Sequence, residues 1–233
     1  MRKISLFVVQ AIAACLIQSA SAQYSMPPGS PEELEATYIT SIENRTAAIV
    51  ASLDLNNAEK SARVHDIIIA QYRTLRARDE AIDSLLKLQG KEVNYKNRAP
   101  LMQSESKALH DKFLAKLATE LTPEQVEIVK NKMTYNKVQV TYVAYCSIFS
   151  DLTEADKTEI MDKLKAAREE AMDGGSAAEK SAIFQKYKDQ INDYLNAHGH
   201  DVAKAYKEWE AKQQASNQKA SGGAAGDSTP TNK

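Results

Sequence analysis

Apolar residues recur every three or four positions along most of the chain, and this period predicts amphipathic α-helices. The pattern begins after residues 30–33 (Ser-Pro-Glu-Glu), which form a capping box with proline at the first helical position. Further polar residues are placed to cap helices at Asn56, Thr122, Thr153, Ser176 and Asp201. The pair Gly174-Gly175 is placed to end a helix. The sequence therefore predicts a helical domain over residues 31–212.

Two stretches are less regular. A polar connector runs to Pro100 before the third helix. Residues 135–149 are rich in β-branched and aromatic residues, but no second strand-like run is present to pair with them. We therefore expect an extended segment followed by a helix over residues 141–149. The predicted fold is all-α, a single irregular bundle of about seven or eight helices.

The two ends of the chain have a different composition. Residues 1–22 combine Arg2 and Lys3, an apolar stretch and a closing Ala-Ser-Ala, which predicts a signal peptide cleaved before Gln23. An alternative is a lipoprotein anchored at Cys15, within Ile-Ala-Ala-Cys. Either alternative makes the protein extracytoplasmic, periplasmic or secreted, without a transmembrane helix. Residues 23–30 form a leader, and residues 213–233 are predicted to be a disordered tail.

The net charge and the cysteine content bear on two possible kinds of function, nucleic-acid binding and thiol chemistry. The net charge is −1, so no bulk electrostatic attraction draws the chain to nucleic acid. After removal of the signal peptide Cys146 is the one cysteine left, and its apolar neighbours predict a buried, inert thiol. No motif identifies a reaction or a cofactor, so the sequence does not decide whether the protein is an enzyme, and it does not give an oligomeric state.

Three charged residues occupy positions that the helical period assigns to the core: Asp79, Arg168 and Lys188. Buried charges need partners, so we predict that Asp79 pairs with Arg168 or Lys188 beside a cavity edged by Tyr142 or Tyr187. The functional interpretation is a polar ligand pocket. The structural alternative is a buried salt bridge, or cations that extend to water.

The candidate ligand-binding residues combine these charges with aromatic and hydrogen-bonding side chains. They are Asp79, Arg168, Lys188, Asn192, Tyr135, Tyr142, Tyr187, His110 and Trp209. Each aromatic ring has filling of the core as its alternative role. His110 precedes Asp111, but adjacent helical residues point in different directions. His198 and His200 are spaced like metal ligands, yet no nearby set completes a site, so no metal is expected.

Two families share stretches with this sequence. Residues 121–125 (Leu-Thr-Pro-Glu-Gln) resemble the Leu-Thr-x-x-Gln signature of small periplasmic stress chaperones, which hold unfolded clients without ATP. A longer resemblance, over about residues 46–209, is to a secreted bacterial family of unknown function, typical of Bacteroides-like polysaccharide degraders and often described as sugar-binding. Its main stretches are residues 62–73, 110–117, 120–125, 133–135, 140–142, 167–173 and 184–195. The chain departs from this family at His198 and His200.

The resemblances and the candidate residues together lead to three hypotheses of different classes. The first is a non-catalytic binding or accessory protein in bacterial glycan utilisation, with carbohydrate as its partner. The second is a periplasmic holdase-type chaperone. The third is an enzyme of unrecognised type acting on polysaccharide, with Asp79 or Glu169 as the acid or base.

Overall fold

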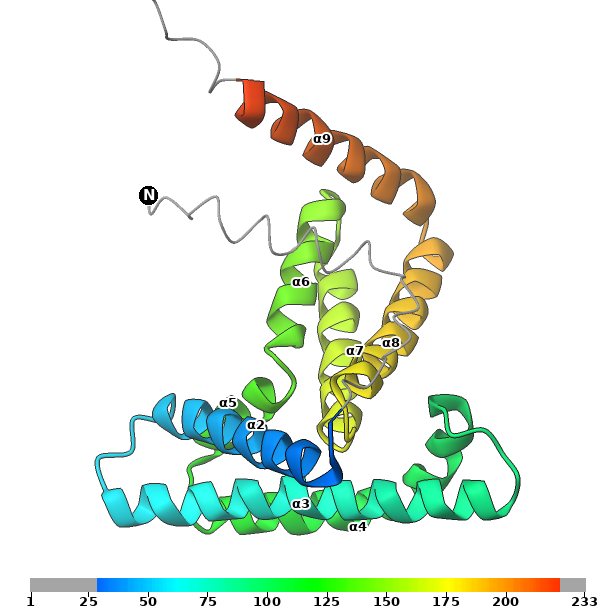
Figure 1. Ribbon diagram of the computed structural model, residues 1–233. Helices are drawn as coiled ribbons and strands as arrows, with labels where there is room; N and C mark the ends of the chain where they lie inside the picture. The colour runs from blue at the N-terminus through cyan, green and yellow to red at the C-terminus, as the bar shows by residue number, and fades with distance from the viewer. Residues whose placement is uncertain (1–28, 223–233) are drawn as a thin grey trace, which may run out of the picture. The chain divides into compact units, whose positions relative to one another are not determined.

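The computed structural model describes residues 29–222, apart from the side chains of residues 104, 105 and 218–222. These residues form eight helices and no strand, so the predicted all-α class is confirmed (Figure 1). The helices are α2 (Pro31–Ala51), α3 (Ala58–Leu88), α4 (Tyr95–Ala118), α5 (Pro123–Met133), α6 (Lys137–Ile148), α7 (Glu154–Met172), α8 (Ala177–Ala197) and α9 (Val202–Gly222). The predicted signal peptide and the Cys15 alternative lie outside the described residues.

The described residues form two compact units rather than the predicted single bundle. Unit 1 consists of Gln139–Met161 and the described part of Asp189–Lys233. Unit 2 consists of the described part of Tyr24–Val138 together with Asp162–Lys188. Helices α7 and α8 each contribute residues to both units.

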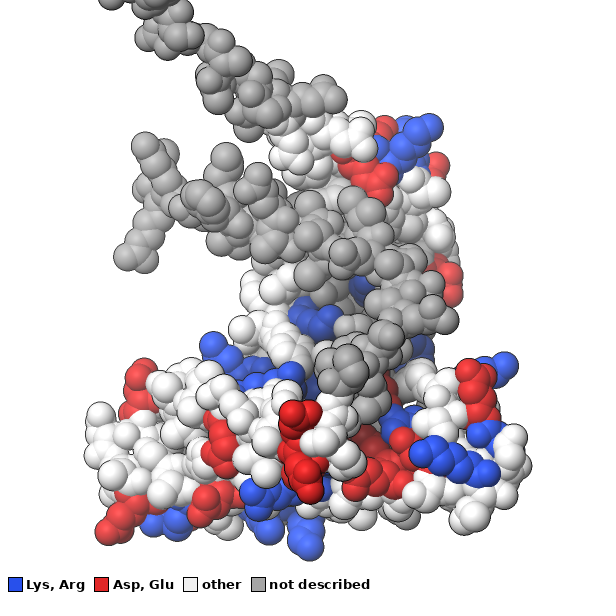
Figure 2. Space-filling model, in the orientation of Figure 1, with Lys and Arg blue, Asp and Glu red and all other residues white. Residues whose placement is uncertain are grey.

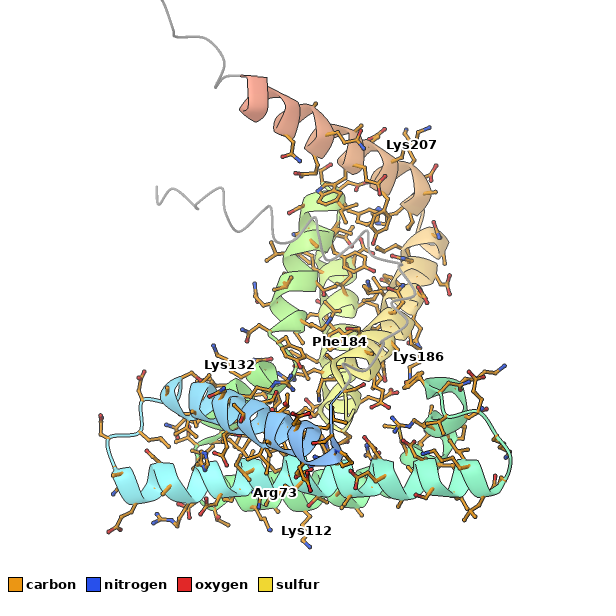
Figure 3. All side chains as sticks on the ribbon, viewed as in Figure 1. Arg73, Lys112, Lys132, Phe184, Lys186 and Lys207 are labelled. Carbon is orange, nitrogen blue, oxygen red and sulfur yellow. The ribbon has the colours of Figure 1, made fainter. Side chains whose placement is uncertain are left out.

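Unit 2 is built on α3, which packs against α2 and α4, while α5 also packs against α2 and α4. Its core consists of Ile49, Leu53, Val64, Ile68, Phe113, Leu117, Leu121, Val129, Met133 and Met172. Burying one such side chain stabilises the fold by roughly 1.5–3 kcal/mol. Arg73 on α3 and Lys112 on α4 point away from this core (Figure 3). The apolar stripes read from the sequence are therefore the faces that these helices bury.

The capping boxes predicted at Ser30 and Thr122 are confirmed. The Ser30 N–H donates to Glu33 Oε2 at 2.8 Å, and the Glu33 N–H donates to Ser30 Oγ at 3.2 Å. Thr122 and Gln125 make the same reciprocal pair at the start of α5. Gln125 also donates from Nε2 to the Leu53 carbonyl at 3.2 Å. The glutamine of the Leu-Thr-x-x-Gln stretch therefore caps one helix and ties it to the chain just after another.

Three helix boundaries differ from the sequence prediction. Helix α4 begins at Tyr95, within the predicted connector, and contains Pro100. Helix α6 begins at Lys137, so the expected extended segment is instead a turn in which Tyr135 and Asn136 have φ of 58° and 53°. With no second strand to pair with, the β-branched residues that follow adopt helix. Residues 213–222, placed in the tail by the sequence, continue α9 because alanine, glutamine and lysine favour helix.

Unit 1 has an aromatic core. Tyr145 stacks on Phe149 with ring centroids 6.1 Å apart, and His200 and Tyr206 meet the Phe149 ring edge-on. The Tyr145 hydroxyl donates to Asn192 Oδ1 at 2.9 Å. These contacts connect α6, α8 and α9 within this unit.

Two surface properties bear on function. Among the helices that the structure describes, none has the length and apolar character needed to cross a bilayer. On the face shown in Figure 2, acidic and basic side chains are interspersed rather than gathered by sign. This distribution agrees with the net charge of −1.

Candidate functional site

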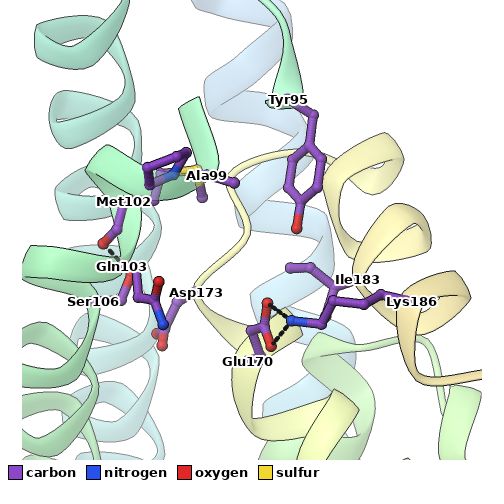
Figure 4. A pocket seen from close by; sticks show the side chains of 10 residues that line it. Tyr95, Ala99, Met102, Gln103, Ser106, Glu170, Asp173, Ile183 and Lys186 are labelled. Atoms are coloured by element: carbon purple, nitrogen blue, oxygen red, sulfur yellow. Dashed lines mark hydrogen bonds and ion pairs between the residues drawn. The ribbon is translucent and has the colours of Figure 1, made fainter. Parts of the chain in front are cut away.

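A pocket of about 400 Å³ lies in unit 2 beside the first turns of α4, the end of α7 and the first half of α8 (Figure 4). We call it the α4–α8 pocket. It is lined by Tyr95, Ala99, Pro100, Met102, Gln103, Ser106, Glu170, Asp173, Ile183 and Lys186. Its volume falls within the range of about 300–1,000 Å³ typical of small-molecule sites.

The α4 side of the pocket is formed by the first turns of the helix, which begins at Tyr95, earlier in the chain than the sequence predicted. The Asn94 side chain accepts a hydrogen bond from the Asn97 N–H at 3.0 Å and so caps the helix. Tyr95, Ala99 and Met102 then follow at helical spacing and line the pocket. Pro100 has no backbone N–H, so the helix loses one intrahelical hydrogen bond at this position. The proline ring is part of the pocket lining. The Asn94-x-x-Asn97 pair was the available signal for this start, and Pro100 obscured it.

Ion pairs engage both carboxylates of the pocket. Lys186 Nζ lies 2.7 and 2.6 Å from the two oxygens of Glu170, and the Tyr187 hydroxyl donates to the same carboxylate at 3.0 Å. Burial and this carboxylate raise the pKa of Tyr187 to about 12. Asp173, 7% exposed, lies with Oδ2 3.2 Å from His110 Nδ1, which is an ion-pair contact without an aligned hydrogen bond. Each of the two acidic residues in the pocket lining therefore has a cation beside it.

His110 bridges two carboxylates behind the pocket. Besides Asp173 it contacts Glu169, with Nε2 3.4 Å from Oε2. The two neighbouring carboxylates raise the pKa of His110 to about 9, although burial opposes the shift. Asp173 makes the larger contribution and Glu169 the smaller one. The imidazole is therefore protonated at neutral pH, and Asp173 lies against a positive charge.

Three polar groups in the pocket lining are of the kind that a ligand can hydrogen-bond to. Asp173 Oδ1 is buried and has no hydrogen-bond partner among the described residues. The same lining contains the half-buried Tyr95, with its hydroxyl, and the exposed Gln103, with its amide. Figure 4 shows the Tyr95 ring extending toward Ile183 and the Glu170–Lys186 pair. A ligand can thus meet one acceptor and two donor-acceptor groups beside an aromatic ring.

Charged side chains from α3 and α8 fix the turn that carries Asp173. Arg78 Nη2 donates to the Asp173 carbonyl at 2.7 Å. Lys180 Nζ donates to the Ala171 carbonyl at 2.8 Å, and burial lowers the pKa of Lys180 to about 8. Glu179 Oε2 accepts from the Gly175 N–H at 2.8 Å. These bonds satisfy backbone groups that the end of a helix leaves unpaired.

The predicted pairing of Asp79 with Arg168 is wrong. Both residues are buried, as the apolar stripes indicated, but Asp79 Oδ1 pairs with Arg78 Nη2 at 2.7 Å. Burial raises the pKa of Asp79 although Arg78 opposes the shift. Arg168 faces α5 and α7 instead, with Glu127 at 2.8 Å and Glu169 at 2.7 Å. The register of α7 turns Arg168 toward α5, so the two charges find separate partners.

The other predicted residues are divided between the two units. Lys188 is half-buried on α8, and Tyr135 is 41% exposed with the Arg45 guanidinium carbon 5.8 Å from its ring centroid. Tyr187 contacts Glu170 but, like Tyr142, does not line the pocket. Asn192, Tyr142 and Trp209 belong to unit 1, where Trp209 lines a separate pocket of about 300 Å³ with His200.

The structure also describes the surroundings of Cys146 and His200, the residues singled out for sulfur and histidine chemistry. Cys146 is exposed rather than buried, because it lies on the outer side of α6. His200 is held by Asp156, with Nε2 3.2 Å from Oδ2. In the described part of the chain, no group of three or more histidine, cysteine or acidic side chains has an arrangement that could hold a metal ion.

Gly175 provides the first test of this arrangement. A Cβ atom there would overlap Asp79 Oδ2, whereas on Gly174 it would lie 3.3 Å from the Ala171 carbonyl. We expect Gly175→Ala to lower the free energy of unfolding by roughly 1–3 kcal/mol, because the buried carboxylate must move. Urea unfolding of both alanine variants measures this. An equal loss in Gly174→Ala, the matched control, would contradict it.

His110 provides the second test. Its pKa is about 9 in the folded protein and 6.5 ordinarily, so its stabilisation is complete below pH 6.5 and is lost as pH rises to 9. The free energy of unfolding of the wild type should therefore exceed that of His110→Gln by up to about 3 kcal/mol at pH 6, and by much less at pH 9.5. Urea unfolding of both proteins at each pH gives the difference, from which groups common to both cancel. A difference independent of pH would refute the charged role of His110.

Comparison with known proteins adds one match. A family model described as "Protein of unknown function (DUF3826)" matches residues 39–215, which include every residue of the α4–α8 pocket. No curated protein matches the chain.

Proposed function

Since the chain belongs to the DUF3826 family, whose description assigns no activity, we propose from its pocket that it is a non-catalytic carbohydrate-binding protein. We propose further that it acts outside the cytoplasm as an accessory protein in bacterial glycan utilisation. The observation that carries the proposal is the pocket lining, which includes the unbonded Oδ1 of Asp173, the Gln103 amide and the Tyr95 ring with its hydroxyl.

These groups suit a polyhydroxylated ligand. A sugar hydroxyl both donates and accepts hydrogen bonds, so it can donate to Asp173 and exchange bonds with Gln103 or Tyr95. Asp173 belongs to the pocket lining, and its Oδ1 has no hydrogen-bond partner among the described residues. The apolar face of a sugar ring can pack on the Tyr95 ring, beside Ile183 and Met102.

The ion pairs favour binding over catalysis. A general acid needs surroundings that keep its proton at neutral pH, such as an apolar pocket without a nearby cation. Glu170 lies against Lys186, and Asp173 lies against His110. Glu169, the acid nominated by the enzyme hypothesis, is bound by His110, Lys130 and Arg168, which lower its pKa to about 2 against the opposing effect of burial. Each of these carboxylates is thus in contact with at least one cation.

The proposed extracytoplasmic location, periplasmic or secreted, is supported by the composition of residues 1–22, with its charged start, apolar centre and small-residue end. The link to glycan breakdown rests on the resemblance to a secreted, sugar-binding type of family. The chaperone hypothesis has less support, because a holdase needs a broad apolar face. In the described residues the exposed large apolar side chains are spread over α2, α3, α6 and two connecting segments.

Saccharide binding tests the proposal directly. A panel of neutral mono- and oligosaccharides at millimolar concentration should perturb the wild-type protein in calorimetry or in NMR spectra. Tyr95→Ala should weaken that binding about tenfold, because the ring contact and one hydrogen bond are lost. Tyr142→Ala, a partly exposed tyrosine of unit 1, is the matched control and should leave it unchanged. Absence of any saccharide response, or equal affinity in Tyr95→Ala, would overturn the proposal.

A further inference from the structure

We infer that His110, which does not line the α4–α8 pocket, sets its ligand selectivity: the imidazolium holds and neutralises Asp173, so that the pocket takes an uncharged saccharide and discriminates against amino sugars. This inference rests on the proposed function, because it assumes that the pocket is a binding site. It makes His110 a positioning residue rather than a ligand contact.

The geometry isolates the His110–Asp173 pair. The His110 side chain is 15% exposed and lies between two carboxylates, those of Asp173 and Glu169. Glu169 already has two other cations, with Lys130 Nζ at 2.8 Å and Arg168 Nη2 at 2.7 Å. Asp173 has no ion-pair partner other than His110 in the part of the chain that the structure describes. His110 is therefore the cation in ion-pair contact with Asp173, while the buried Lys180 ammonium attracts the same carboxylate from a longer distance.

The remaining charges near this pair do not replace it. Arg78 donates to the backbone carbonyl of Asp173 and pairs through its side chain with Asp79. Lys180 Nζ is bonded to the carbonyls of Ala171 and Met172, at 2.8 and 3.3 Å. On α4 itself, Asp111 pairs with Lys107. Since the pKa of His110 is about 9, its positive charge is present throughout the physiological range.

Selectivity follows from this charge balance. Glu170 is neutralised by Lys186 just as Asp173 is by His110, so the pocket has oriented acceptors but no unpaired anion. An ammonium group would lose its hydration on entering and find no free negative charge in exchange. A hydroxyl group incurs a much smaller desolvation cost and can still donate to Asp173. Without the imidazolium, the same carboxylate would become a site for cations.

The experiment uses methylammonium as the probe of charge and methanol as its uncharged counterpart, with NMR titration at pH 7. Wild type should respond to methylammonium no more than to methanol. His110→Gln should bind methylammonium at least about tenfold more tightly than wild type. An unpaired carboxylate interacts with a neighbouring cation by the equivalent of one pKa unit or more, and one pKa unit is tenfold in affinity. The double variant His110→Gln with Asp173→Asn, which removes both charges, should return to the wild-type response.

The outcomes separate the two proposals. Saccharide binding by wild type without any gain of methylammonium binding in His110→Gln overturns the inference and leaves the proposed function standing. A gain that the double variant abolishes, in a protein that binds no saccharide, supports the charge role of His110 and overturns the proposed function. If His110→Gln does not fold, wild type is titrated at pH 7 and pH 10. No increase in methylammonium affinity above the pKa of His110 then refutes the inference.

Discussion

The turn between α7 and α8 depends on a small set of buried charges that bind its backbone. Arg78 from α3 holds the Asp173 carbonyl, and Lys180 and Glu179 from α8 hold the backbone on either side of the glycine pair. Arg98, near the start of α4, pairs with both Glu179 and Asp83. Both sides of the pocket are therefore fixed through the same turn. The cost of burying these charges is offset because each one satisfies a backbone group or another charge.

The helices were largely predictable because caps and apolar spacing are local signals. Ser30, Thr122 and Thr153 begin helices by bonds to residues three positions away, and such bonds depend on sequence alone. The start of α4 was not predictable in the same way, because Pro100 normally marks a helix boundary. Here the proline lies in the second turn and lines a pocket. The function of that turn is visible only once α7 and α8 are placed beside it.

The candidate site was predictable only in part, for a physical reason. Helical period identified Asp79 and Arg168 as buried charges, and both are buried. It did not identify their partners, because Arg78 and Glu169 adjoin them in sequence and a helical projection separates adjacent residues by about 100°. A long guanidinium side chain can fold back across that angle. Asp173 and Glu170, the acids of the pocket, lie near a helix end, where period carries little information. For His110 the helical period correctly argued against Asp111 as a partner, but it could not identify Asp173 and Glu169, which lie far away in the sequence.

The close approach of Asp79 to Gly175 has a consequence for how such sequences diverge. The carboxylate occupies the space that any side chain on Gly175 would need, so Gly175 is not free to change while Asp79 keeps its place. Relatives that keep the acid must keep the glycine, and relatives that acquire a side chain at the turn must shorten or lose the acid on α3. Although these two residues lie far apart in the sequence, evolution can change the glycine only together with the acid. Correlated substitution at the pair would then mark which relatives retain the same turn, and with it the same pocket.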